Sequence, residues 1–262
     1  MLQAKDITVS FGAKKILDEV SFTAKTGQVT AIVGPNGSGK TTLLRAITGE
    51  VPYSGQVLFG DHDIQHMQAW DLASQRAVLS QSTALAFPFT VIEVVRIGLH
   101  RSRLGGAEKI AVAALSNVGL AGYANRHYQE LSGGEQQRVQ LARVLAQVWE
   151  PVVDDVPRWL FLDEPVSSLD IGHQLEVMEI MRGFASAGGG VVAVMHDLNL
   201  TALYADQIVM MAQGRILAND TPEQALTNEN LSTAYNCPIQ INRPPAMGVP
   251  FVLPQVFTQP EL

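Results

Sequence analysis

The sequence predicts an α/β fold that is built on a mostly parallel sheet and carries an inserted helical lobe. First, an apolar strand at residues 29–33 runs through a glycine-rich loop into a helix that starts near residue 42. Second, residues from 159 to about 213 alternate between strand-like and helical stretches, as a mostly parallel sheet requires. Third, the pattern becomes helical between about residues 84 and 146, which places the lobe in the middle of the chain.

The remaining elements follow from local patterns. Residues 1–30 alternate in short strands with turns at Gly12 and Gly27, and residues 56–59 form a further strand-like piece. Helices are expected where apolar residues recur at helical spacing or a Thr-Pro pair marks a start, namely over residues 90–99, 108–115 and 221–226. The tail, with prolines at 238, 244, 245, 250 and 254, is expected to be irregular.

Composition limits the classes of function. The 262 residues, 47% of them hydrophobic, suffice for one large domain with a sizeable core. A net charge of −7 argues against a protein that binds nucleic acid, which usually carries a basic stripe. No apolar run has the length of a transmembrane helix, and the N-terminus lacks the apolar segment of a signal peptide. The single cysteine, Cys237, excludes an internal disulfide and suits a reducing compartment.

The glycine-rich loop matches the phosphate-binding pattern G-x-x-x-x-G-K-[ST]. Successive backbone amides in such a loop, at a helix N-terminus, form a concave anion site. Lys40 adds a positive charge for the β- and γ-phosphates, and the Thr41 hydroxyl is placed to reach a magnesium ion. The alternative is a chance glycine-rich turn, which the flanking strand and helix disfavour. The predicted phosphate site comprises Gly34, Pro35, Asn36, Gly37, Ser38, Gly39, Lys40, Thr41 and Thr42.

Further motifs follow in a fixed order along the chain. Residues 131–138 read Leu-Ser-Gly-Gly-Glu-Gln-Gln-Arg. An apolar strand ends in Asp163 and Glu164, and a second one ends in His196. Together with the phosphate loop, these motifs resemble the ATP-binding cassette (ABC) ATPases over nearly the whole chain. The resemblance adds three positions: Gln81, a loop at residues 166–170 that contains Asp170, and the aromatic residue Phe11.

The resemblance implies how the domain is divided. We expect a P-loop NTPase core with a mostly parallel sheet, an antiparallel β subdomain and an inserted α-helical subdomain. The whole chain, residues 1–262, would form one ABC ATPase domain. Its core, with the β subdomain and the tail, would comprise residues 1–83 and 147–262, and residues 84–146 would form the helical subdomain.

The resemblance also implies ATP and Mg²⁺ as cofactors and a role for each matched residue. Asp163 would hold Mg²⁺ through water, with Thr41 and Gln81 as further magnesium contacts. Glu164 would polarise the attacking water. Adjacent residues on a strand point to opposite faces, so the two carboxylates can divide these roles only where the strand ends. His196 would bond the γ-phosphate, and Phe11 would stack on adenine. The alternative for Asp163 and Glu164 is a solvated acidic pair at a strand end. The alternative for His196 is a satisfied core residue or a simple turn residue.

The motif at residues 131–138 is implied to act in a second copy of the chain. Ser132, Gly133 and Gly134 precede a helix expected to begin near Glu135, where small residues and the helix N-terminus favour a phosphate. In the family this loop completes the nucleotide site of the partner copy, and Asp170 is a further nucleotide-binding residue. The implied assembly is a head-to-tail dimer around two ATP molecules. The alternative for Ser132 is a plain helix cap.

Several segments resemble particular importers. Residues 85–95, 196–200 and 204–206 resemble ATPase subunits of importers for iron chelates, haem and cobalamin. The segment 148–158 is longer than in most relatives and, with the tail around residues 236–238, resembles the haemin-import ATPases of Gram-negative bacteria. Ordinary loop variation is the alternative. Cys237 also invites a hypothesis of thiolate ligation to haem, although a lone cysteine is more often a small hydrophobe.

This resemblance implies an energy-coupling ATPase of a bacterial importer. Two copies would bind two copies of a transmembrane permease at the cytoplasmic face of the inner membrane, with a periplasmic substrate-binding protein as an indirect partner. A groove near residues 85–103 would receive a helix of the permease. The alternatives are the same role for cobalamin or a ferric siderophore, and a soluble ABC ATPase that acts on ribosomes or DNA complexes. The second usually has two cassettes or a long coiled insertion.

Two residues depart from the family pattern. Phe11 stands where tyrosine is commoner, so the position loses a hydroxyl but keeps the aromatic face. Val166 replaces the threonine usual at that position, where we expect little effect.

Overall fold

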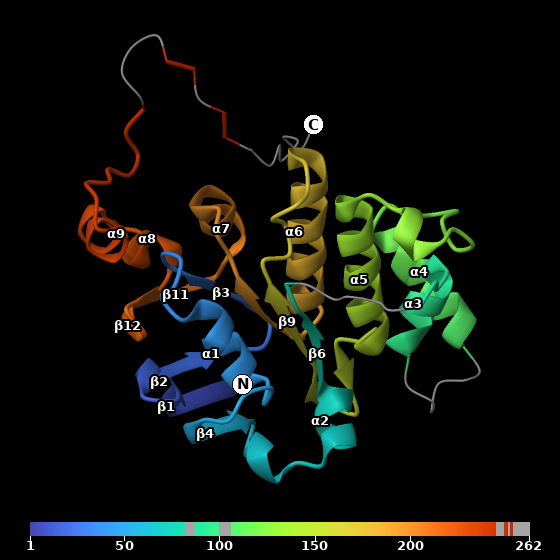
Figure 1. The fold of residues 1–262 in the computed structure, drawn as a ribbon, viewed down its shortest axis with the longest axis horizontal. Helices are drawn as coiled ribbons and strands as arrows, with labels where there is room; N and C mark the ends of the chain where they lie inside the picture. The colour runs from blue at the N-terminus through green and yellow to red at the C-terminus, as the bar shows by residue number, and fades with distance from the viewer. Residues whose placement is uncertain (82–86, 100–105, 245–248, 251, 254–262) are drawn as a thin grey trace.

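The computed structural model describes residues 1–81, 87–99, 106–244, 249–250 and 252–253. Its centre is a six-stranded sheet in the order β12-β11-β3-β10-β9-β6, in which β12 alone runs antiparallel to its neighbour (Figure 1). The strands are β3 (Val29–Val33), β6 (Arg76–Leu79), β9 (Trp159–Asp163), β10 (Gly190–Val194), β11 (Gln207–Ala212) and β12 (Arg215–Asp220). The predicted α/β fold with a mostly parallel sheet is confirmed.

A second, antiparallel sheet has the order β2-β1-β4-β5. It is formed by β1 (Leu2–Phe11), β2 (Lys14–Ala24), β4 (Ser54–Phe59) and β5 (His62–Asp63). The expected turns are both present, because Gly12 and Gly27 have positive φ angles of 60° and 78°. This sheet and helix α1 (Lys40–Ile47) lie on the same side of the central sheet (Figure 1).

Helices cover the opposite face and one edge of the central sheet. The helices α3, α4 and α5 gather beyond β6, whereas α6 and α7 pack against the sheet and α8 and α9 lie near β11 and β12 (Figure 1). Their bounds are α2 (Ala69–Gln75), α3 (Val91–Ile97), α4 (Ala107–Asn117), α5 (Gly133–Gln147), α6 (Ile171–Ser186), α7 (Leu198–Tyr204), α8 (Pro222–Ala225) and α9 (Asn228–Tyr235). Among the residues described, no helix is both long and apolar enough to cross a membrane.

The two faces of the central sheet belong to two separate cores. On one face, Ile32, Phe161 and Val192 join buried residues of α1 and of the antiparallel sheet. On the other face, Ala31 and Leu160 join the apolar sides of the helices. Strands buried on both faces read as continuous apolar runs, which is why every residue of β3, β9 and β10 is buried. Such strands hold their carboxyl ends rigidly.

The strand order brings four sequence motifs to one edge. The strands β3, β10, β9 and β6 are consecutive neighbours and parallel, so their carboxyl ends lie along the same edge of the sheet. The phosphate loop follows β3, His196 follows β10, Asp163 ends β9, and Gln81 follows β6. In open parallel sheets, ligands bind beyond the carboxyl ends of the strands. This edge is therefore where a ligand site is expected.

Some elements differ from those predicted. Helix α5 begins at Gly133, so the expected start near Glu135 is two residues late; the Ser132 side chain caps the helix by accepting from the Glu135 amide. Helix α2 was not predicted. The segment 148–158 contains a hairpin, β7 (Val152–Val153) and β8 (Val156–Pro157), whose turn residues Asp154 and Asp155 both have positive φ angles. Two such residues in sequence give the turn that matches the strand twist.

Candidate nucleotide site

A cavity of about 710 Å³ opens at the carboxyl edge of the central sheet. The phosphate loop and the start of α1 line it, together with Gln81, Glu164 and His196. Lys14 and Ile16 of the β1–β2 hairpin complete the wall. The fold therefore brings together residues that are up to 182 positions apart in the sequence, from Lys14 to His196.

The shape of the phosphate loop depends on glycine at its first position. Gly34 has a φ angle of +145°, and a Cβ atom there would lie 2.2 Å from the carbonyl oxygen of Met211. Gly39 has a φ angle of +102° and would place a Cβ atom 2.8 Å from a methyl group of Leu17. Side chains at these two positions would push the loop away from β11 and β2. The tight turn of the loop thereby directs the N-terminal end of α1 toward the cavity.

Lys40 is the buried cation of the site. Its Nζ atom donates to the carbonyl oxygens of Gly34 and Pro35 at 2.8 and 3.0 Å. Burial lowers the pKa of the Lys40 ammonium group, while the charges of Glu164 and Asp163 raise it. A buried cation that loses hydration in this way gains from an anion placed beside it. The electrostatics of the loop thus favour a phosphate.

Asp163 and Glu164 lie where β9 ends, and they have different partners. The Oδ1 atom of Asp163 accepts a hydrogen bond from the Thr41 hydroxyl at 3.2 Å. Burial raises the pKa of the Asp163 carboxyl above its usual value, and the Thr41 hydrogen bond lowers it. Glu164 has a φ angle of +54°, so the backbone turns sharply between the two residues. The strand end lets the two carboxylates serve separate purposes.

Glu164 joins the other two predicted residues of this edge. Its Oε1 atom lies 2.6 Å from His196 Nε2, and its Oε2 atom accepts from Gln81 Nε2 at 3.0 Å. The Glu164 side chain is 16% exposed and that of His196 is 42% exposed. The three side chains come from the ends of three neighbouring strands. They form a hydrogen-bonded group that lines the same cavity as the phosphate loop.

Oxygen ligands for a hard cation are present next to the phosphate loop. Magnesium prefers a few protein oxygens together with water and phosphate oxygens. The Thr41 hydroxyl and the Asp163 carboxylate already lie within hydrogen-bonding distance of each other. This donor set fits Mg²⁺, and the buried ammonium of Lys40 fits the phosphates that would accompany it.

The remaining predicted residues lie outside this cavity. Ser132 and Glu135 form a capping box at the start of α5, in which Glu135 Oε2 accepts from the amide and hydroxyl of Ser132 at 2.8 Å each. Those hydrogen bonds hold the pKa of Glu135 below its usual value. Asp170 caps α6 by accepting from the His173 amide at 3.0 Å. Phe11, at the end of β1, is 54% exposed. None of these lines the cavity of its own chain.

Two residues near the site were missed by the sequence analysis. Gln137 Nε2 donates to the Glu164 carbonyl oxygen at 3.1 Å. Burial raises the pKa of the Tyr235 phenol, and a hydrogen bond from the Gly34 backbone lowers it to a lesser extent. Gln137 stands inside the motif at residues 131–138, so a signal existed for it. Tyr235 lies 201 positions from Gly34 and has no local signal.

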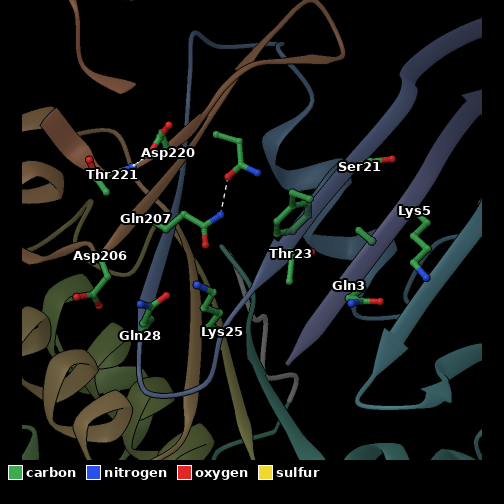
Figure 2. Close-up of a pocket in the computed structure, with 13 residues that line it drawn as sticks. Gln3, Lys5, Ser21, Thr23, Lys25, Gln28, Asp206, Gln207, Asp220 and Thr221 are labelled. Carbon is green, nitrogen blue, oxygen red and sulfur yellow. Dashed lines mark hydrogen bonds between the residues drawn. The ribbon is translucent and has the colours of Figure 1, made fainter. Parts of the chain in front are cut away.

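A second cavity, of about 580 Å³, lies at the opposite end of the strands. Figure 2 shows it between the two sheets, with Gln3 and Lys5 on one wall and Gln28 and Asp206 on the other. Asp206 accepts from the Val29 amide at 2.7 Å, at the amino end of β3. Its lining lies just before β3 and at the start of β11, the amino ends of these two parallel strands, and it also includes the ends of β2 and of the antiparallel β12. It therefore lies away from the phosphate loop and the acidic pair.

Two other predictions extend beyond the described residues. The docking groove expected at residues 85–103 includes residues 85–86 and 100–103, which lie outside the described residues. Residue 254 of the tail, one of the prolines named above, also lies outside them. Within the described part, Phe87 and Ile97 are 68% and 55% exposed. Cys237 is exposed and follows α9.

Comparison with known proteins places the chain in a family. The family described as "ABC transporter" matches residues 17–167. The hemin import ATP-binding protein HmuV of Jannaschia sp. is 58% identical over 256 residues, which cover 98% of this chain and 95% of that protein. The HmuV protein of Roseobacter denitrificans is 60% identical over 253 residues, or 97% of each chain.

Solved structures agree with this assignment. A nucleotide-free ATP-binding cassette from an ABC transporter is 26% identical with a TM-score of 0.73, covering 91% of this chain and 96% of its own. The ADP conformation of another ABC transporter cassette is 26% identical with a TM-score of 0.75, covering 90% and 98% of the two chains. The chain belongs to the ABC transporter family and is one of its nucleotide-binding ATPase cassettes.

Proposed function

We propose that this chain is the ATP-hydrolysing, energy-coupling subunit of a bacterial haemin importer. The observation that carries the ATPase role is the group formed by Glu164, His196 and Gln81 opposite the buried Lys40. The haemin assignment is supported by identities of 58% and 60%, over nearly the full length, to proteins named for hemin import.

In the proposed site, the phosphate loop binds the phosphates of ATP. The backbone N–H groups of Gly34 and of residues 36–42, together with the Lys40 ammonium group, contact the β- and γ-phosphates, and Phe11 stacks on adenine. Thr41, and Asp163 through water, would hold Mg²⁺, with Gln81 as a further contact. When bound, the ion neutralises charge on the transferred phosphoryl group. The buried, partly desolvated Lys40 supports this arrangement because it needs an anionic partner.

Hydrolysis transfers the γ-phosphoryl group to water. Glu164 accepts a hydrogen bond from that water and aligns it with the bond between the γ-phosphorus and the bridging oxygen. This phosphorus–oxygen bond then breaks, and ADP leaves. His196 donates to a γ-phosphate oxygen and orients Glu164. In the structure Glu164 and His196 bond each other, and Lys40 donates to loop carbonyls. We propose that ATP replaces these contacts, so that binding prepares the site for hydrolysis.

The second half of the site comes from a second copy of the chain. Ser132, Gly133, Gly134 and Glu135 of one copy would contact the γ-phosphate held by the other, together with Asp170. The exposure of Ser132 and Gly133 at a helix N-terminus, outside their own cavity, supports a role across an interface. ATP then favours the closed head-to-tail dimer, and hydrolysis removes that preference.

Two copies of a permease and a periplasmic binding protein complete the proposed importer. The cassette would lie at the cytoplasmic face of the inner membrane, held there by the permease. The exposed Phe87 and Ile97 on the helical side support a docking surface for a permease helix.

The assay that tests this function is ATP hydrolysis in liposomes. The complex of this chain with the permease that co-purifies with it is reconstituted with binding protein carrying haemin, cobalamin or a ferric siderophore. Stimulation by the haemin-loaded protein alone is expected, and the complex with Glu164→Gln serves as the inactive control. Stimulation by one of the other ligands alone would overturn the haemin assignment and keep the importer role. If none of the three loaded binding proteins stimulates hydrolysis, both the haemin assignment and the importer role are overturned.

A further inference from the structure

Three glutamine side chains project from the first turns of α5, but they have different partners. Gln136 Nε2 donates to the carbonyl oxygens of Tyr128 and Leu131 at 3.2 and 3.1 Å. Gln140 Nε2 donates to the Tyr128 hydroxyl at 3.1 Å. Gln137 instead reaches the Glu164 carbonyl oxygen at 3.1 Å, at the end of β9. Of the three, Gln137 is the one that joins the helix to the proposed catalytic base.

The backbone of Glu164 requires such support. Its φ angle of +54° is unfavourable for a residue with a side chain, and such conformations persist when their surroundings hold them. The Glu164 amide donates to Val194 at 3.1 Å. Its carbonyl oxygen also accepts from the Ser167 hydroxyl at 3.2 Å and the Ser167 amide at 3.3 Å. Among the described residues, Gln137 is the one donor to this carbonyl that comes from the helical part of the chain.

Gln137 lies in a polar cavity of about 320 Å³ between the core and the helical part of the chain. Gln81, Asp163 and Ser167 line it from the core, and Gly133 and Gln136 line it from the helical part. The Oε1 atom of Gln137 is buried and has no hydrogen-bond partner among the described residues. The amide is therefore oriented through its nitrogen, which makes its position sensitive to movement of α5.

Helix α5 also carries the loop proposed to bind the partner's nucleotide. Ser132 caps this helix, and Gln137 follows five residues later, about 7.5 Å along the helix axis. A continuous helix transmits displacement over that distance with little loss. Movement of the cap when the dimer closes would thus move the amide that bonds Glu164.

We infer that Gln137 is a positioning residue that links the helix bearing Ser132 to the backbone of Glu164, so that closure on the partner's ATP aligns the base in its own site. This inference rests on the proposed function, because it takes Glu164 as the group that orients water. The inference leaves the proposed substrate, ATP, as it is. It adds Gln137 as a connection between the two nucleotide sites of the dimer.

The test is ATP hydrolysis by Gln137→Met, which keeps the length of the side chain but removes its donor. The matched control is Gln147→Met on the same helix, whose amide donates to the carbonyl oxygens of Ala73 and Arg76 at 2.8 and 2.9 Å. Each substitution removes amide-to-carbonyl bonds between α5 and the core. We expect kcat of Gln137→Met to fall about fivefold, with the affinity of the monomer for ATP unchanged. We expect Gln147→Met to keep its kcat.

An equal kcat in wild type and Gln137→Met would overturn the inference, as would equal losses in both variants. If Gln137→Met does not fold, Gln137→Glu, which has the same shape but no amide donor, replaces it. A double variant separates the inference from the proposed function. In a Glu164→Gln background, Gln137→Met should not lower the residual hydrolysis further. If Glu164→Gln alone retains full activity, the proposed role of Glu164 fails; if it is inactive and Gln137→Met is fully active, this inference alone fails.

Discussion

His196 Nε2 lies 2.6 Å from Glu164 Oε1, although the two residues are separated by 32 positions in the sequence. The contact exists because β10 and β9 are adjacent parallel strands, with Val194 in register with Asp163. Each residue follows the end of its strand, so the two side chains meet beyond the sheet. Gln81 bonds the other carboxylate oxygen, so each oxygen of the proposed base has a polar side-chain partner.

Replacing His196 tests whether this contact serves hydrolysis. We expect His196→Ala to lower steady-state ATP hydrolysis about 10²-fold, the typical contribution of a positioned polar group at a reacting centre. ATP binding should remain, because the phosphate loop is untouched. The control is His66→Ala, whose side chain is 84% exposed and distant from the cavity. Similar activities of the two variants would show that His196 has no part in the reaction.

Ser132→Arg tests whether the loop before α5 acts in the partner's site. The arginine side chain would occupy the space into which the partner's phosphate must fit. We expect hydrolysis to be abolished while the monomer still binds a fluorescent ATP analogue. Thr90→Ala controls for the lost helix cap, since Thr90 forms the same kind of capping box with Glu93 on α3. Loss of ATP binding by the Ser132→Arg monomer would mean that the loop serves its own chain.

Asp163→Asn should stabilise the nucleotide-free protein at neutral pH. Burial raises the pKa of Asp163 above 3.8, so the folded state holds this proton more tightly than the unfolded state. Its contribution to stability is therefore present below pH 3.8 and is lost as pH rises through the raised pKa. Asparagine removes the buried charge and can still accept from Thr41.

Thermal unfolding at several pH values measures this effect. We expect the Tm of Asp163→Asn to exceed that of wild type at pH 7, with a difference that narrows toward pH 4. The same variant should lose magnesium-dependent hydrolysis. A Tm difference that stays constant across this range would exclude Asp163 as its cause.

Gly34→Ala should disrupt the phosphate loop. The added methyl group would lie 2.2 Å from the Met211 carbonyl oxygen, a contact that the buried backbone of β11 cannot relieve. We expect a lower Tm and loss of ATP binding. Gly60→Ala is the control, because Gly60 also has a positive φ angle, +60°, but no heavy atom within 4 Å of the added carbon. It should cost only about 1–2 kcal/mol of backbone strain. Equal losses in both variants would contradict the packing argument.

The sequence was most informative where local chemistry is strict. The strand at residues 29–33, the loop after it and the α/β class follow from apolar runs and glycine spacing, and each is present. Helix α2 was not predicted because its seven residues hold one buried side chain, Leu72, which gives little periodicity. The hairpin at residues 152–157 depends on two aspartates with positive φ angles, which turn patterns indicate only weakly.

The contacts within the site required the fold. Patterns along the chain place Glu164 and His196 at strand ends, but they do not give the strand order that makes β9 and β10 neighbours. Gln137 and Gln136 are adjacent and identical in sequence, and only the orientation of α5 decides which of them reaches Glu164. Tyr235 meets the phosphate loop only because α9 packs against β11 and β12. Such contacts are tertiary and have no local signal.

The central claim is that Glu164 orients the water that hydrolyses ATP. The most direct measurement is light scattering of Glu164→Gln with ATP and Mg²⁺, together with its rate of phosphate release. Glu229→Gln, an exposed substitution in α9, serves as the control and should turn over ATP as wild type does. We expect Glu164→Gln to form a stable ATP-bound dimer with almost no phosphate release. Phosphate release at the wild-type rate, with no accumulation of dimer, would contradict the account.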